Sequence, residues 1–221
     1  MVFVGGIVMV ISLRRVAPAG TLTAQCGVPA GIATRAVLSL AFFGIEVFLP
    51  LAMTELRGAS IVIAGLGVAA GALVWVLGSI AQSHHEQRRG TQTRRLDAVC
   101  GFVTLAIGIT VIASTLLGDV LPVYAAIAGW AIGGFGMGLA YNATTAATFS
   151  ETNPQAFGEM SGTIQMAQTL GTAVIAGVGT AFLSATALTT GLGAIFAATA
   201  LLSLTAIPLA LRITTGGEST L

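Results

Sequence analysis

The stretch FFGIEVFLP, from Phe42 to Pro50, sets one carboxylate, Glu46, in the middle of an apolar run from Ala36 to Met53. An acidic side chain at the centre of a membrane span costs about 2.5–3.5 kcal/mol on insertion scales. A buried carboxyl group favours its neutral form and can release the proton when a cavity hydrates or a cationic ligand arrives. Glu46 is therefore a candidate for proton coupling. The alternative is a neutral glutamic acid that hydrogen-bonds a neighbouring helix as a structural contact.

Polar side chains at helical spacing accompany this glutamate. Ser39, Phe43, Glu46 and Pro50 share one face of a helix because they follow i, i+4, i+7 and i+11. Two later apolar segments carry similar stripes, namely Trp130, Gly134, Met137, Tyr141 (with Asn142 beside it), Thr145 and Thr148, and then Ser161, Gln165, Gln168 and Thr172. Three helices thus offer polar faces to one another. The alternative for each single residue is an interhelical hydrogen bond worth about 1 kcal/mol.

The composition is that of a membrane protein, because 55% of the 221 residues are hydrophobic and only 8% are charged. All nine basic residues are arginines and the net charge is +1, so no basic surface for nucleic acid is expected. Cys26 and Cys100 stand alone, which predicts neither a disulfide framework nor a metal cluster.

Six apolar segments are long enough to span a bilayer, at about 20 residues each. They predict an all-α, polytopic membrane helix bundle, since a backbone in hydrocarbon must satisfy its own hydrogen bonds and the alternation of a barrel strand is missing. Glycines four residues apart, such as Gly67 and Gly71 or Gly134 and Gly138, predict close helix packing. The segments are 36–54, 60–82, 97–117, 121–148, 160–183 and 187–211.

The N-terminal run 1–13 is apolar but too short to span, at about 20 Å of helix against a core of about 30 Å. It predicts a partial transmembrane helix whose outer part is missing; the alternative is an interfacial helix. A cytoplasmic connector would follow at 14–35, then the six-helix bundle at 36–212 and a cytoplasmic tail at 213–221. This orientation puts eight arginines inside and only Arg57 outside.

No catalytic or metal site is expected, and the chain is predicted not to be an enzyme. His84 and His85 are adjacent and lack the i, i+4 geometry of a helical zinc site. We interpret 83–95 as a solvated cytoplasmic loop. An intramembrane protease would need its histidine or paired aspartates within the spans, but both histidines lie in this loop, and Asp97 and Asp119 lie at segment ends.

The order of a cytoplasmic connector (14–35), six spans and the sequence GSIAQSHHEQRRGTQTRR after the second span resembles that of a known family. This sequence is similar to a degraded copy of the major facilitator motif Gly-x-x-x-Asp-Arg/Lys-x-Gly-Arg/Lys-Arg/Lys, with Gly78 at the glycine and Gln82 in place of the aspartate. Arg88 and Arg89, or Arg94 and Arg95, stand at the basic pair. The stretch FGEMSGTIQMAQTLGTAVIAG resembles the eleventh helix of the family. The whole chain thus resembles the C-terminal half of a major facilitator superfamily transporter.

The resemblance implies a function and a site. The segments 36–54, 121–148 and 160–183 would be the seventh, tenth and eleventh helices, around one cavity. Glu46 would couple protons, and the cavity residues would be Phe43, Met137, Tyr141, Asn142, Gln165 and Gln168. The implied activity is proton-coupled efflux of a lipophilic or cationic compound across the plasma membrane, without a cofactor. The partner would be the missing N-terminal half or a second copy. Alternatives are a non-transporting membrane partner and a non-functional fragment.

Overall fold

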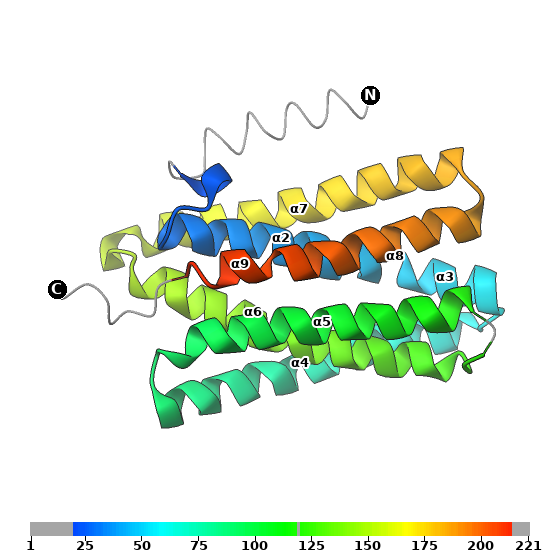
Figure 1. Ribbon diagram of the computed structural model, residues 1–221, viewed down its shortest axis with the longest axis horizontal. Helices are drawn as coiled ribbons and strands as arrows, with labels where there is room; N and C mark the ends of the chain where they lie inside the picture. The colour runs from blue at the N-terminus through cyan, green and yellow to red at the C-terminus, as the bar shows by residue number, and fades with distance from the viewer. Residues whose placement is uncertain (1–19, 119, 214–221) are drawn as a thin grey trace.

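A computed structural model describes residues 20–118 and 120–213, and within these ranges the chain is helical and contains no strand. The long helices run side by side along the long axis of the molecule (Figure 1). The predicted partial helix 1–13 and nearly all of the tail 213–221 lie outside the described residues. The elements are η1 (Thr21–Thr23), α2 (Val28–Glu46), α3 (Leu49–Arg57), α4 (Ile61–Arg89), α5 (Thr93–Leu117), α6 (Tyr124–Ser150), η2 (Pro154–Ala156), α7 (Phe157–Ala185), α8 (Leu188–Thr205) and α9 (Ile207–Ala210).

Five helical segments are long and apolar enough to cross a membrane, which agrees with the prediction of a helical membrane protein. They are Val28–Arg57, Ile61–Arg89, Thr93–Leu117, Pro154–Ala185 and Leu188–Ala210. The remaining long helix, α6, is not among them, because its many glycines and its tyrosines, asparagine and threonines lower its mean hydropathy. The count of six spans therefore stays a prediction.

The first span is broken between α2 and α3, at the candidate proton site. Pro50 has no N–H with which to bond the carbonyl group of Glu46 four residues earlier. The amide of Phe48 instead bonds the carbonyl oxygen of Ile45 at 3.0 Å, a tighter turn. Glu46 is thus the last residue of α2. The helix also begins earlier than predicted, at Val28, so the end of the predicted connector 14–35 is its first two turns.

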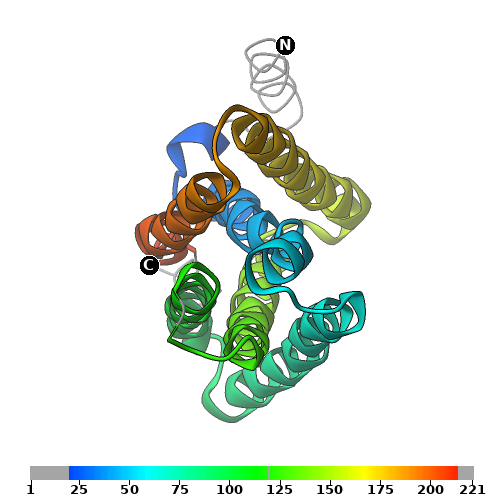
Figure 2. The same ribbon diagram turned by 90° about the vertical axis from the view of Figure 1, so that its right-hand side faces the viewer.

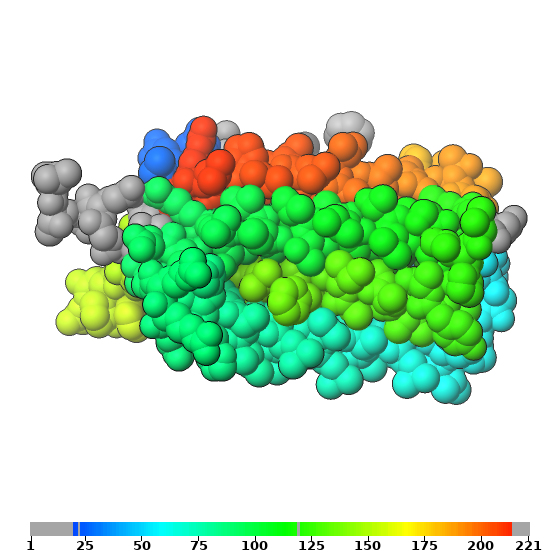
Figure 3. Space-filling model, turned by 60° about the horizontal axis from the view of Figure 1, so that its bottom comes forward, coloured from blue at the N-terminus to red at the C-terminus, as the bar shows by residue number. Residues whose placement is uncertain are grey.

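Helix α6 packs tightly between α4 and α5, and glycines make this possible. A Cβ atom at Gly101 of α5 would lie 2.6 Å from the carbonyl oxygen of Gly136, and one at Gly134 would overlap the backbone of Gly71 in α4. The close approach predicted from the glycine spacing is confirmed at these crossings. Seen from the α5 side, α6 fills the strip between α5 and α4, so this face of the bundle is closed (Figure 3).

Helices α4 and α7 lie at two far corners of the bundle, with α2 and α3 between them (Figure 2). Only 22% of the most apolar stretch of α4 and 17% of that of the α7 segment is buried, against 50% for α5 and 56% for the α2–α3 span. The bundle therefore has a buried centre around α2, α5 and α6 and two largely uncovered helices.

The prediction of a loop at 83–95 is wrong for most of that range. Helix α4 continues through both histidines to Arg89, and α5 begins at Thr93, so only Gly90–Gln92 connects them. Polar side chains permit this because they pair with one another across the helix ends, as described below.

Candidate functional site

Glu46 lies on the side of α2 that its neighbouring helices cover least, where it is partly buried. Helix α6 packs against the face of α2 that carries Phe42, whose ring stacks on Trp130 with 4.4 Å between the ring centroids. Helices α7 and α8 pack against the face of α2 that carries Gly44, where an added Cβ atom would meet Ile175 and Thr199. Phe43 and Glu46, three residues apart, remain partly buried on the face between α6 and α7. Among the described residues the Glu46 carboxylate has no hydrogen-bond or ion-pair partner.

Aromatic rings connect this face of α2 to α4 and α6. The ring of Phe43 lies 6.5 Å from that of Trp75 in α4, and Trp75 lies 5.2 Å from Tyr141 in α6, both in edge-to-face arrangements. Phe43, Trp75 and Tyr141 are all only partly buried. The three rings therefore form a continuous, accessible aromatic wall across three helices, of a kind that suits apolar or cationic ligands.

Arg35 is a charged residue that the sequence interpretation assigned to the cytoplasmic connector. The structure buries it to 2% exposure between α2 and α6. Its Nη2 donates to the carbonyl oxygen of Tyr141 at 3.2 Å and to the hydroxyl group of Thr145. Its guanidinium carbon lies 3.4 Å from the centroid of the Tyr141 ring. The missed signal was its position one turn before Ser39, which extends the polar face of α2.

The pairing of Arg35 is incomplete. Its Nε and Nη1 atoms are buried and have no hydrogen-bond partner. Its contacts are the two hydrogen bonds and the Tyr141 ring, and no carboxylate in the described part of the chain neutralises this arginine. A buried cation without a counter-ion is costly, and Arg35 is therefore a second unbalanced charge on the helix that carries Glu46.

A groove follows the seam of α4 and α6 and contains one of the predicted cavity residues, Asn142. Two adjoining hollows of about 510 and 570 Å³ share Ser83, Gln87 and Asn142 in their walls. Asn142 Nδ2 donates to the carbonyl oxygen of Ser79 at 3.1 Å, which holds its amide at the groove wall. Trp75 lines the first hollow, so the groove begins at the aromatic wall.

The other predicted cavity residues are spread over the bundle. Met137 is fully buried in the core. Gln165 is exposed on α7, and Gln168 is partly buried with an Oε1 atom that has no partner. The structure thus brings Phe43, Tyr141 and Asn142 to one side of the molecule. Met137, Gln165 and Gln168 do not join them in one pocket. Their role in a cavity stays a prediction.

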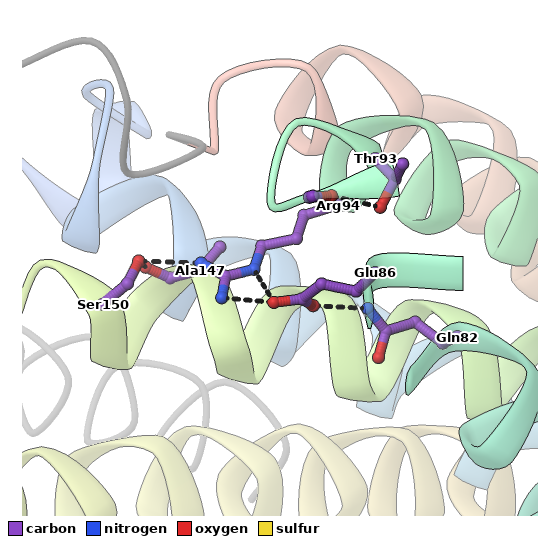
Figure 4. A network of polar contacts seen from close by, with 7 residues as sticks. Gln82, Glu86, Thr93, Arg94, Ala147 and Ser150 are labelled. Carbon is purple, nitrogen blue, oxygen red and sulfur yellow. Dashed lines mark hydrogen bonds and ion pairs between the residues drawn. The ribbon is translucent and has the colours of Figure 1, made fainter. Parts of the chain in front are cut away.

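The arginine-rich end of the bundle, where α4 meets α5 and α6, holds a connected polar cluster (Figure 4). Arg94 donates to Glu86 Oε1 from Nε at 3.0 Å and from Nη2 at 2.6 Å, and its Nη1 donates to Ser150 Oγ at 3.0 Å. Gln82, buried at the aspartate position of the resembled motif, donates to Glu86 Oε2 at 2.9 Å. This cluster ties three helices together.

The remaining residues of the loop motif occupy different environments. Gly78 is buried where α4 crosses α6, and a Cβ atom there would overlap the backbone of Phe135. Arg88 and Arg89 are exposed and take no part in the cluster. His85 Nδ1 lies 2.6 Å from Oδ1 of the buried Asp97. No group of three or more His, Cys, Asp or Glu side chains in the described ranges is placed to hold a metal ion.

Arg57, the one arginine assigned to the outer side, has a structural role at the end of α3. It donates to the carbonyl oxygen of Leu121 at 2.7 Å and also to those of Thr115 and Gly118. These carbonyl groups lie at and just beyond the C-terminal end of α5, where backbone acceptors lack helical partners. The exception to the charge bias therefore has a local physical reason.

Comparisons with models of known protein families and with curated proteins find no match to this chain.

Proposed function

We propose that this chain is one helical bundle of a major facilitator carrier that exports a lipophilic or cationic compound in exchange for protons across the plasma membrane. The observation that carries the proposal is the position of Glu46. It is an unpaired, partly buried carboxyl group at a helix break, on the least covered side of α2 beside Phe43. The tail after α9 would lie in the cytoplasm, together with the arginine-rich end.

The helix break supports a proton-coupling role for Glu46. A continuous helix holds a side chain in one orientation, whereas the turn at 47–48 has a tighter hydrogen-bond pattern and a proline that weakens the connection to α3. The carboxyl group can therefore change between a dry and a hydrated environment with little cost to the rest of the bundle. Neutral when dry and ionised when hydrated, it would exchange its proton for a cationic compound at the aromatic wall.

The least covered face supports a second bundle as partner. Polar and aromatic groups of α2, α4 and α6 open toward the side between α4 and α7, and lipid is a poor solvent for a carboxyl group. Alternating access in the resembled family rocks one six-helix bundle against another around a central site. The partner would be a second six-helix bundle, either the N-terminal half of such a carrier or a second copy of this chain. A single bundle would then bind substrate at most and would not transport it.

Reconstitution tests this proposal. The purified chain is sized in detergent by light scattering with the detergent mass subtracted, and monomeric and assembled fractions are placed in liposomes with a pH gradient. Accumulation of ethidium, a lipophilic fluorescent cation, is then measured. We expect accumulation only where a second bundle is present. A monomer that concentrates ethidium would overturn the two-bundle requirement, and assembled fractions that ignore the pH gradient would overturn proton-coupled cation transport.

A further inference from the structure

One exposed line of side chains on α4 changes from apolar to basic toward the arginine-rich end. Leu73, Leu77, Ile80, His84 and Arg88 follow i, i+4, i+7, i+11 and i+15, and therefore share one face of the helix. The three apolar members are 70%, 57% and 48% exposed, and the two basic members are exposed as well. With a rise of about 1.5 Å per residue, the line is about 22 Å long.

The basic part of this line borders a hollow of about 450 Å³. Its walls are Ala81, His84, His85, Arg88 and Arg89, so every lining residue except one alanine is basic. The hollow lies on α4, which is one of the two largely uncovered membrane helices. Its place at the end of the apolar stretch corresponds to the level of lipid headgroups.

The acidic side chains near the hollow are already engaged. Glu86 accepts from Arg94 and Gln82, and Asp97 is bonded to His85. Arg88 and Arg89 have no ion pair in the part of the chain that the structure describes. Two guanidinium groups therefore face the hollow without a counter-ion, and guanidinium forks match phosphate oxygens in geometry and charge.

We propose that this hollow is a binding site for an anionic phospholipid, with the phosphate at Arg88 and Arg89 and one acyl chain along Leu73, Leu77 and Ile80. The apolar line favours a lipid over free phosphate, because it offers exposed hydrocarbon contacts that inorganic phosphate cannot use. Basic clusters next to a membrane helix attract anionic headgroups with about 1 kcal/mol per arginine. The inference depends on α4 crossing the membrane and not on the proposed transport activity.

The test is a lipid titration of the purified chain in detergent, followed by native mass spectrometry. The probes are phosphatidylglycerol, which is anionic, and phosphatidylcholine, which has no net charge. We expect preferential binding of phosphatidylglycerol to the wild type and a loss of about fivefold in affinity for each arginine replaced, so that the Arg88→Gln, Arg89→Gln double variant binds at least about 20-fold more weakly. Both side chains are exposed and outside the polar cluster, so the fold should persist.

Arg212→Gln is the control for the loss expected per arginine, because it removes one positive charge at the same end of the bundle but outside the hollow. Its affinity for phosphatidylglycerol should stay within about twofold of the wild type, and millimolar inorganic phosphate should not displace the lipid. An unchanged affinity of the double variant would overturn the proposal. So would an equal loss in Arg212→Gln, which would indicate general charge attraction, or displacement by inorganic phosphate, which would indicate a phosphate site.

Discussion

Buried or partly buried charged side chains are paired at the arginine-rich end of the bundle and unpaired in its interior. At the end, Arg94 is bonded to Glu86 and Ser150, and Asp97 is bonded to His85. In the interior, Arg35 keeps two buried donor atoms without partners, and the partly buried Glu46, on the same helix, has no partner among the described residues. Paired charges fix the relative positions of helices, whereas unpaired ones are held at a cost and can respond to a ligand or a proton. The contrast indicates a rigid end and a responsive interior.

The largest expected effect is on transport, from Glu46→Gln in the assembled carrier. Glutamine keeps the size and hydrogen-bonding capacity of the side chain but has no proton to exchange. We expect proton-driven accumulation of ethidium in liposomes to fall at least about 100-fold, with ethidium binding retained. The control is Glu55→Gln, which changes an exposed glutamate of α3 and should transport normally. Normal uphill transport by Glu46→Gln would remove the proton role.

The next effect concerns the rigid end, through Arg94→Gln. Loss of the guanidinium group leaves Glu86 with one fewer strong donor and releases Ser150, which should lower the free energy of unfolding by about 2–3 kcal/mol. For a chain of this length that corresponds to a fall in Tm of roughly 5–10 °C, measured by circular dichroism in detergent. Arg88→Gln, on an exposed side chain, should change Tm by less than about 2 °C. Equal Tm values for the two variants would contradict a stabilising role of the polar cluster.

A smaller effect is expected from His85→Ala at the same end. The substitution leaves the carboxylate of Asp97 buried and without its partner, which should cost about 1–2 kcal/mol in the free energy of unfolding. His84→Ala is the natural control, because His84 is the adjacent residue and is exposed. If both variants unfold at the same temperature, the bond between His85 and Asp97 contributes nothing to the junction of α4 and α5.

The smallest of these effects on stability should come from Arg35→Met, although Arg35 is the most deeply buried charged side chain among the described residues. Methionine gives up the bonds to Tyr141 and Thr145 but also removes the cost of burying an uncompensated cation. We expect the free energy of unfolding to change by no more than about 1 kcal/mol in either direction, which is less than for Arg94→Gln. If the free energy of unfolding falls by about 3 kcal/mol or more, Arg35 stabilises the fold as the paired charges do, and the contrast between the two regions is weakened.

Local patterns predicted the helices well. The segments 97–117 and 160–183 correspond to α5 (Thr93–Leu117) and α7 (Phe157–Ala185), with ends displaced by a few residues. Hydropathy and the need to satisfy the backbone in lipid act within a segment, so they can be read along the chain. The same reasoning failed at 83–95. There the charged residues are helical because Glu86 is paired with Arg94, eight positions away, and Arg94 with Ser150, 56 positions away.

The candidate site was only partly predictable for the same reason. The spacing of Phe43 and Glu46 placed them on one face of a helix, and both lie on the least covered side of α2. Met137 shares the stripe of Tyr141 but is buried, because α6 is enclosed by α4 and α5 and has little free surface. Arg35 was assigned to a loop from its place in the chain, and its position against Tyr141 depends on a helix more than 100 residues away.

The amino-acid sequence by itself determined that the described part of the chain is helical and apolar enough to span a membrane, that its helices pack closely at glycines, and that one carboxyl group stands inside a candidate span. Each of these follows from properties of neighbouring residues, namely hydropathy, side-chain size and helical period. The tertiary structure decided which charges are paired, where the first span breaks, and which faces of α4 and α7 stay uncovered. These depend on which segments meet, because a hydrogen bond or a buried face requires a partner from another part of the chain.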